Sequence, residues 1–169
     1  MATITLKGNS IHTLGELPAI GEKSPDVELV KNDLSRVRLK DFFGSKLVLN
    51  IFPSLDTGTC AMSVRTFNKL VVGQNNTKVL CISRDLPFAQ KRFCGAEGIE
   101  NVITLSDFAT HEFGKKYQLE IIDGGMAHLL SRVVLVLDTN GIVVYKEQVP
   151  EIVNEPNYEA ALNELKKIK

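Results

Sequence analysis

Cys60 is the residue of this sequence whose surroundings most favour chemistry. It follows an apolar run at 47–52 that has the length and branching of a buried strand. Pro53 ends this run, because proline has no N–H to donate to a neighbouring strand. From Cys60 onward, apolar residues recur at helical spacing as far as Val71. The sequence therefore predicts that Cys60 lies in the first turn of a helix, at the carboxyl end of a strand.

A cysteine at the start of a helix is placed to react as an anion. Unpaired backbone N–H groups and the positive end of the helix dipole favour negative charge there. A thiol in that position ionises more readily, and the thiolate is the nucleophile. The alternative is that Cys60 is one more small buried residue, which is the common fate of free cysteines. Its place after a strand and a polar turn favours the reactive role.

The two other cysteines are predicted to have different surroundings. Cys81 lies inside an apolar strand at 79–83, and we expect it to be buried and inert. Cys94 lies in the last turn of a predicted helix that Gly95 ends, where the dipole opposes a thiolate. This asymmetry suits a pair in which Cys60 is oxidised to a sulfenic acid and Cys94 then condenses with it. On spacing alone, a packed residue at a helix end is an equally good interpretation of Cys94.

The sequence gives no support for a metal site or a dithiol reductase. It has no C-x-x-C or H-x-x-x-H spacing, and its three cysteines fall on separate predicted elements. His12, His111 and His128 are isolated, so we expect them to be surface or capping residues. We therefore expect neither a metal nor an organic cofactor.

The surrounding elements predict one α/β domain over residues 1–169. Apolar runs at 47–52 and 79–83, separated by a helix, indicate parallel strands with a right-handed crossover. The sequence Asp-Thr-Asn-Gly at 138–141 predicts a hairpin, and residues 3–14 predict an N-terminal hairpin that turns at Gly8-Asn9. We expect a mixed central sheet with helices on both faces. The remaining predicted strands are 27–30, 37–39, 102–105, 133–137 and 142–145, and the predicted helices are 60–72, 86–94, 108–117 and 158–168.

Composition excludes several classes of function. The 44% hydrophobic and 24% charged content is ordinary for a soluble globular protein. Twenty basic and twenty acidic residues give a formal net charge of zero, without a basic run that would indicate nucleic-acid binding. The longest apolar run is far short of a membrane span. Residues 1–7 lack the pattern of a secretion signal, and three cysteines are an odd number for a disulfide framework, so we expect a cytoplasmic protein.

The segment Pro53-x-x-x-Thr57-x-x-Cys60 resembles the active-site signature of peroxiredoxins. The longer stretch 50–60, with the residues that follow it at 63–68, is similar to the thiol peroxidase branch of that family. The resemblance covers essentially the whole chain. Its further matches are Leu80-Cys81-Ile82-Ser83, Asp85-Leu86-Pro87-Phe88-Ala89-Gln90, Arg92-Phe93-Cys94-Gly95-Ala96-Glu97-Gly98 and Asn101-Val102-Ile103-Thr104-Leu105.

This resemblance implies a thioredoxin-like fold with an N-terminal β-hairpin, and an atypical two-cysteine peroxidase. It makes Cys60 the peroxidatic residue and Cys94 the resolving residue, joined in a disulfide within one chain. Thr57 would hydrogen-bond the thiolate and the peroxide, and Pro53 would shield the site from water. The second active-site arginine of the family corresponds to Arg132.

The resemblance also implies substrates and partners. Hydroperoxides would be the substrates, with organic peroxides preferred over hydrogen peroxide, and thioredoxin would reduce the disulfide by exchange. It further implies a homodimer. Arg65, on the helix after Cys60, is a weaker candidate for the site than Arg132. Because a disulfide needs Cα atoms within about 7 Å, we expect local unwinding around Cys60, Cys94 or both during turnover.

Two other functions remain open from the sequence. A peroxide-sensing thiol switch would relay its oxidation to a client protein and consume one equivalent of peroxide. A thioredoxin-like binding module with buried thiols would consume none. Repeated turnover with thioredoxin and its reductase distinguishes the enzyme from both.

Overall fold

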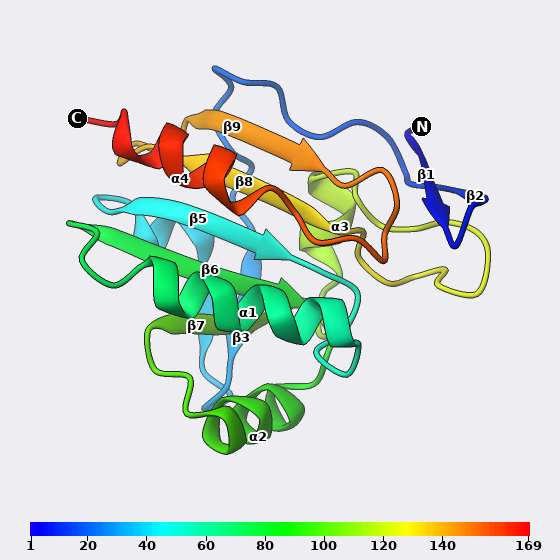
Figure 1. Cartoon of the computed structure of the whole chain (residues 1–169), viewed down its shortest axis with the longest axis horizontal. Coiled ribbons are helices and arrows are strands. Elements are labelled where there is room, and N and C mark those ends of the chain that lie inside the picture. The colour runs from blue at the N-terminus through cyan, green and yellow to red at the C-terminus, as the bar shows by residue number, and fades with distance from the viewer.

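A mixed β-sheet forms the centre of the computed structural model, which describes residues 1–169 (Figure 1). The strands are β1 Thr3–Leu6, β2 Asn9–His12, β3 Glu28–Lys31, β4 Arg36–Arg38, β5 Lys46–Ile51, β6 Thr77–Ser83, β7 Val102–Ser106, β8 Val133–Leu137 and β9 Val143–Gln148. The helices are the 3-10 helix η1 Leu39–Phe42 and the α-helices α1 Gly58–Leu70, α2 Pro87–Glu97, α3 Glu112–Lys116 and α4 Tyr158–Lys166. The predicted α/β fold class is confirmed. None of these helices has the length and apolar character needed to cross a membrane.

The central sheet has seven strands in the order β4-β3-β7-β6-β5-β8-β9, and β1 with β2 forms a separate hairpin. Strands β5, β6 and β7 are parallel neighbours, and α1 makes the predicted crossover from β5 to β6. Strand β8 lies antiparallel on the other side of β5, with Ile51 opposite Val133. The carboxyl end of β5 therefore lies beside the amino end of β8.

Helices cover both faces of the sheet, as predicted (Figure 1). Alternate residues of a strand point to opposite faces, and β5 shows this directly. Leu47 and Leu49 pack in a cluster with Phe113 of α3, whereas Val48 packs with Phe67 of α1 and with the inner face of α4. Two hydrophobic clusters thus hold the sheet between α1 and α4 on one face and α3 with η1 on the other.

The N-terminal hairpin turns one residue earlier than predicted. Leu6 pairs with Asn9, so the turn residues are Lys7 and Gly8 rather than Gly8 and Asn9. Both have left-handed backbone angles, with φ of 51° and 81°, which is the conformation that tight two-residue hairpin turns require. The register follows from burial, because it brings Ile4 opposite Ile11 with both side chains in one cluster.

Two predicted helices have different ends in the structure. Helix α2 continues through Gly95 to Glu97, and Gly98, with φ of 64°, ends it by donating its N–H to the Cys94 carbonyl. The prediction placed the terminating glycine three positions too early, because a glycine is also tolerated inside a helix at a modest cost. Helix α3 begins only at Glu112, since His111 has a left-handed φ of 57° that breaks the predicted 108–117 helix.

Candidate functional site

Cys60 is the third residue of α1 and follows the carboxyl end of β5, as the sequence predicted. Thr57 is the residue that caps this helix: its Oγ1 accepts a hydrogen bond from the Cys60 N–H at 3.3 Å. The same hydroxyl donates to the Ser54 carbonyl at 3.2 Å. Capping and the turn before it therefore hold the sulfur where the first backbone N–H groups of a helix converge.

Arg132 contacts the Cys60 sulfur directly. Its Nη2 donates to Sγ at 3.2 Å, and its Nε donates to the Ile152 carbonyl at 2.8 Å. The third nitrogen, Nη1, is buried without a partner. The structure thus places a permanent positive charge against the sulfur, and leaves one buried N–H group free to bind a further atom.

The Cys60 side chain has no exposed surface. It belongs to a hydrophobic cluster that includes Phe52, Leu55 and Val64. A substrate in solution can reach the sulfur only if some of these side chains move. The sulfur is therefore buried, but it lies at a helix start and beside the guanidinium that the family resemblance assigned to it.

Pro53 is buried at the start of the loop between β5 and α1. It lies two residues past the end of β5, in the loop that leads to α1. It is therefore at the same end of the sheet as Thr57 and Cys60. A proline there leaves no N–H group unpaired in the apolar surroundings. Its shielding of the site from water remains a prediction.

Asp85 belongs to the site in a way that the sequence did not indicate. Its carboxylate accepts hydrogen bonds from Ser54 Oγ at 2.7 Å, from the Leu55 N–H at 2.8 Å and from Ser83 Oγ at 2.6 Å. It therefore ties the loop that precedes Cys60 to the end of β6, two residues before α2. The available signal was its place just past a strand that neighbours β5, where carboxyl ends of parallel strands meet.

A buried polar chain also fixes the first turn of α1 onto the sheet. Asn50 Nδ2 donates to Ser63 Oγ at 3.1 Å, and this hydroxyl donates to the Cys60 carbonyl at 2.7 Å. The same Asn50 nitrogen lies 3.7 Å from Cys81 Sγ. Cys81 is buried as predicted, and burial raises the pKa of its thiol to about 12.

Cys94 lies on α2, half-buried, at the edge of the cluster that contains Cys60. All three cysteines are unpaired. Burial raises the pKa of the Cys94 thiol, and a hydrogen bond with Thr104 partly offsets that rise. The structure thus places the two predicted redox cysteines on neighbouring helices, without a bond between them.

Arg65 does not join the site. Its Nε and Nη2 donate to the two oxygens of Glu97 at 2.8 and 2.9 Å, which holds the end of α2 against α1. The three histidines also have other roles. His12 pairs with Asp123 at 2.6 Å, His128 pairs with Glu120 at 3.2 Å, and His111 precedes α3.

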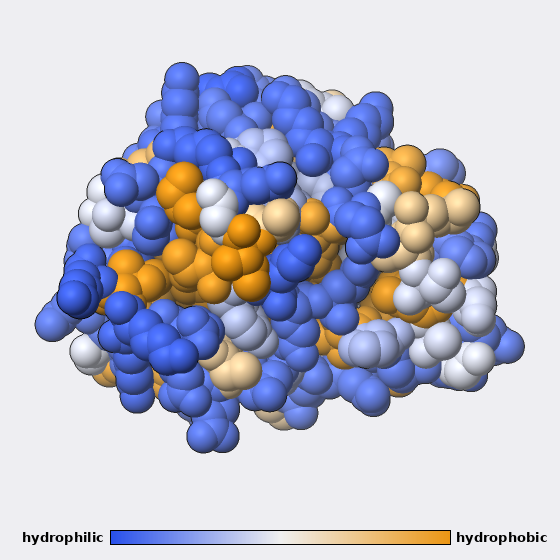
Figure 2. Space-filling view, turned by 90° about the horizontal axis from the view of Figure 1, so that it is seen from above, coloured by the Kyte–Doolittle hydropathy of each residue, from blue (hydrophilic) through white to orange (hydrophobic).

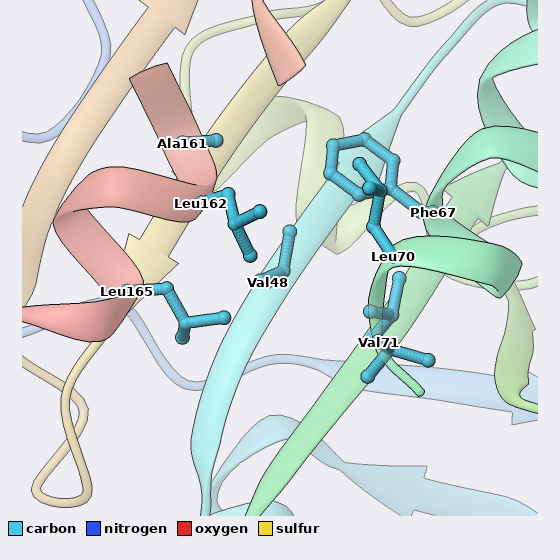
Figure 3. A pocket seen from close by; sticks show the side chains of 8 residues that line it. Val48, Phe67, Leu70, Val71, Ala161, Leu162 and Leu165 are labelled. Carbon is cyan, nitrogen blue, oxygen red and sulfur yellow. The ribbon is translucent and has the colours of Figure 1, made fainter. Parts of the chain in front are cut away.

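A narrow apolar cavity lies between α1 and α4, away from the sulfur (Figure 3). All eight lining residues are hydrophobic, so the cavity offers no group that could carry chemistry or orient a polar ligand. The side chains that line it come from four elements: Val48 of β5, Val79 of β6, Phe67 and Leu70 of α1 with Val71 directly after it, and Ala161, Leu162 and Leu165 of α4. We therefore place the functional site at Cys60 and Arg132.

Comparisons with known proteins identify the family and the fold of this chain. The sequence profile of the Redoxin family matches residues 19–162. The chain is 54% identical over 162 residues to the thiol peroxidase of Mycobacterium tuberculosis, covering 96% of this chain and 97% of that protein. A peroxiredoxin-like protein from Aquifex aeolicus superposes with a TM-score of 0.91 at 36% identity, covering 98% of this chain and 96% of that one. A thiol peroxidase from Chromobacterium violaceum has the same fold, with a TM-score of 0.90 at 18% identity and coverage of 98% and 95%.

Proposed function

The chain belongs to the Redoxin family, in its thiol peroxidase branch, and from that premise we propose that it reduces hydroperoxides through Cys60 and Cys94. One observation supports this proposal above the others: Arg132 Nη2 lies 3.2 Å from the Cys60 sulfur, at the N-terminus of α1. A cation and a helix start together favour a thiolate and the negative charge that develops when an O–O bond breaks.

In the first step, the Cys60 thiolate attacks the terminal oxygen of the hydroperoxide. The sulfur–oxygen bond forms as the O–O bond breaks, the sulfur is oxidised to a sulfenic acid, and the alkoxide leaves as an alcohol after taking up a proton. Arg132 would stabilise the departing charge through its free Nη1 and its Nη2, and Thr57 would orient the peroxide through its hydroxyl. Positioned donors of this kind are typically worth about 10²–10³ in rate each.

In the second step, the Cys94 sulfur attacks the Cys60 sulfenic acid, and water leaves as the disulfide forms. A dithiol protein then reduces this disulfide by exchange and becomes oxidised itself. We propose thioredoxin for that role. The net reaction converts one hydroperoxide and one dithiol into an alcohol, water and a disulfide, so it needs neither a metal nor an organic cofactor.

The surroundings of the sulfur support a preference for organic peroxides over hydrogen peroxide. Cys60 packs in one cluster with Phe52, Leu55 and Val64. A peroxide that reaches the sulfur would therefore be in contact with apolar side chains. An alkyl chain gains from burial against such groups, at roughly 25 cal/mol per Å² of apolar surface, whereas hydrogen peroxide does not.

We also propose that the protein is a homodimer of the cytoplasm. Figure 2 shows hydrophobic residues gathered in separate areas of a mostly hydrophilic face, and exposed apolar areas commonly mark contacts between proteins. On another side of the molecule, Phe88 and Leu86 at the start of α2 are 66% and 52% exposed (Figure 1 shows α2). Three cysteines are an odd number, which does not suit a secreted disulfide framework and suits a reducing compartment. Sedimentation equilibrium would test the dimer.

Two serine variants test the roles of the cysteines. The wild-type protein is expected to consume many equivalents of peroxide with thioredoxin and its reductase. Cys60→Ser should consume none, because the attacking sulfur is gone. Cys94→Ser should react once, leaving a sulfenic acid on Cys60 that dimedone traps and mass spectrometry locates. Wild-type protein that stops after one equivalent would instead support the peroxide sensor, and unchanged consumption by Cys60→Ser would support the binding module.

A further inference from the structure

The guanidinium beside Cys60 owes its orientation to one backbone carbonyl. Arg132 Nε donates to Ile152 O at 2.8 Å, while Nη2 donates to the sulfur. Because the guanidinium is planar and rigid, a fixed Nε also fixes the directions of both Nη groups. Nη1 has no partner, so the Ile152 carbonyl is the only oxygen that holds this group.

Ile152 lies in the loop between β9 and α4, and the N-terminal hairpin holds it there. The Ile152 N–H donates to the Thr5 carbonyl at 2.9 Å, and the Thr5 N–H donates to Pro150 O at 2.7 Å. The Ile152 side chain is 1% exposed and packs with Ile4 and Ile11 of the hairpin. A loop residue that orients the site is therefore positioned by the first twelve residues of the chain.

Glu151 fastens the same loop to the turn of the hairpin. Its Oε2 accepts from Thr5 Oγ1 at 2.6 Å and from the Gly8 N–H at 2.9 Å, and its Oε1 accepts from the Lys7 N–H at 2.8 Å. These bonds, the Thr5 hydroxyl foremost, lower the pKa of Glu151 to about 2. The carboxylate thus stays ionised and bound to the turn at any physiological pH.

From these contacts we infer that Glu151 is a positioning residue for the peroxidase reaction. It holds the loop against the hairpin, the loop places the Ile152 carbonyl, and the carbonyl aims Arg132 at the sulfur and the peroxide. The N-terminal hairpin is on this view part of the catalytic apparatus, although none of its side chains contacts Cys60. The inference rests on the proposed function, since it assigns Glu151 to the step at Cys60.

The test compares Glu151→Gln with Asp123→Asn. Asp123 is a matched control: it holds the other strand of the hairpin, accepting from the His12 N–H at 2.8 Å and pairing with the His12 ring, but does not touch the loop at 149–153. The rates of two reactions of the reduced protein are measured at pH 7 by rapid mixing. The first is the single-turnover reaction with cumene hydroperoxide, and the second is the alkylation of Cys60 by iodoacetamide. Circular dichroism confirms that each variant is folded.

Glu151→Gln is expected to slow the peroxide step about tenfold, less than the roughly 10²–10³ lost when a donor is removed outright. The same variant should also slow the alkylation of Cys60. Both rates of Asp123→Asn should stay within about twofold of the wild-type rates. In an Arg132→Met background, Glu151→Gln should cause no further loss, because coupled residues are not additive.

Equal rates in Glu151→Gln and Asp123→Asn would overturn the inference, and so would a tenfold loss that persists without Arg132. Wild-type protein that leaves peroxide unconsumed would refute the proposed function. The alkylation rates would then still decide whether Glu151 acts on the sulfur through Arg132.

Discussion

At the scale of the residue, three identical thiols acquire different chemistry from what surrounds them. Cys60 has a guanidinium at 3.2 Å and a helix start. Cys94 has a half-buried position near the end of α2. Cys81 is fully buried in a hydrophobic cluster, with the Asn50 amide 3.7 Å from its sulfur. Thiolate character depends on such surroundings rather than on the cysteine itself, so the three thiols of this fold are not chemically equivalent.

The inert thiol leads to a prediction about pH. Burial raises the pKa of Cys81 to about 12, whereas an unfolded cysteine ionises near pH 8.5. The buried neutral thiol therefore makes its full contribution to the free energy of unfolding below about pH 8.5. As pH rises from there toward 12, this contribution falls by about 1.4 kcal/mol per pH unit. Serine does not ionise in this range, so Cys81→Ser should escape that loss.

Urea unfolding under reducing conditions, at several values between pH 7 and 10.5, measures the effect. The difference in unfolding free energy between Cys81→Ser and wild type should be constant below pH 8.5. Above it, the difference should move in favour of the variant. Parallel curves over the whole range would show that the thiol is not sealed from solvent.

At the scale of the element, Asp85 is the link between the loop before α1 and the start of α2. The carboxylate accepts hydrogen bonds from Ser54, Leu55 and Ser83. Replacing Asp85 with asparagine keeps one acceptor oxygen but exchanges the other for an amide NH₂ group, which cannot accept these bonds. Hydrogen bonds to a charged group are worth about 1.5–3 kcal/mol each. Asp85→Asn should therefore speed amide hydrogen exchange at Leu55 by more than about tenfold.

Asp56→Asn is the control for this exchange experiment. The Asp56 carboxylate lies 3.8 Å from Arg92, and the two side chains are 76% and 72% exposed. Exposed pairs of this kind contribute at most about 1 kcal/mol, so exchange at Leu55 should stay near the wild-type rate. Equal acceleration by both variants would show that the loop responds to any lost charge rather than to the Asp85 link.

The elements differ in how far the sequence predicted them. Strands β5, β6 and β8 and the first turn of α1 depend on local patterns, namely apolar runs, Pro53 and the helical spacing from Cys60, and the structure has them where predicted. The predicted end of α2 and the predicted start of α3 were wrong. These bounds depend on which residue takes a left-handed conformation, Gly98 for α2 and His111 for α3.

The candidate site shows the same division between local and distant signals. The position of Cys60 at a helix start was readable from one stretch of sequence, whereas the role of Thr57, three positions earlier, came from the family resemblance. Arg132 is 72 positions from Cys60, and only the family resemblance indicated it. Asp85 and Glu151 escaped prediction altogether, because a single acidic residue beside a strand or in a loop has no periodicity to reveal its partners.

At the scale of the whole molecule, sheet topology brings the distant parts of the site together. Strand β8 runs antiparallel to β5, so its first residue, Val133, lies opposite Ile51, the last residue of β5. Arg132 and the loop that leads to Cys60 consequently lie beside each other at one end of these two strands. The loop between β9 and α4 and the N-terminal hairpin lie together at this end of the sheet (Figure 1), so segments from early and late in the sequence meet beside the candidate site.

The same arrangement predicts which helix opens when the disulfide forms. Helix α1 is anchored by five buried residues: Cys60, Ala61, Ser63, Val64 and Phe67. Helix α2 buries only Pro87 and Gln90, and an exposed ion pair, Arg65–Glu97, holds its far end. Segments with few buried contacts open at the lowest free energy. We therefore predict that α2 unwinds to bring Cys94 to Cys60, while α1 beyond its first turn stays folded.

Hydrogen exchange of the reduced and peroxide-treated protein tests this prediction. After oxidation, amides in 87–97 should lose most of their protection, since a helix held open by a covalent bond exchanges nearly as fast as unfolded chain. Amides in 62–70 and in β5 and β6 should keep theirs. Cys94→Ser treated in the same way should keep α2 protected, because sulfenic acid alone does not pull the helix away. Loss of protection in 62–70 with α2 intact would show that α1 is the helix that moves, and that the sulfur of Cys60 travels to Cys94.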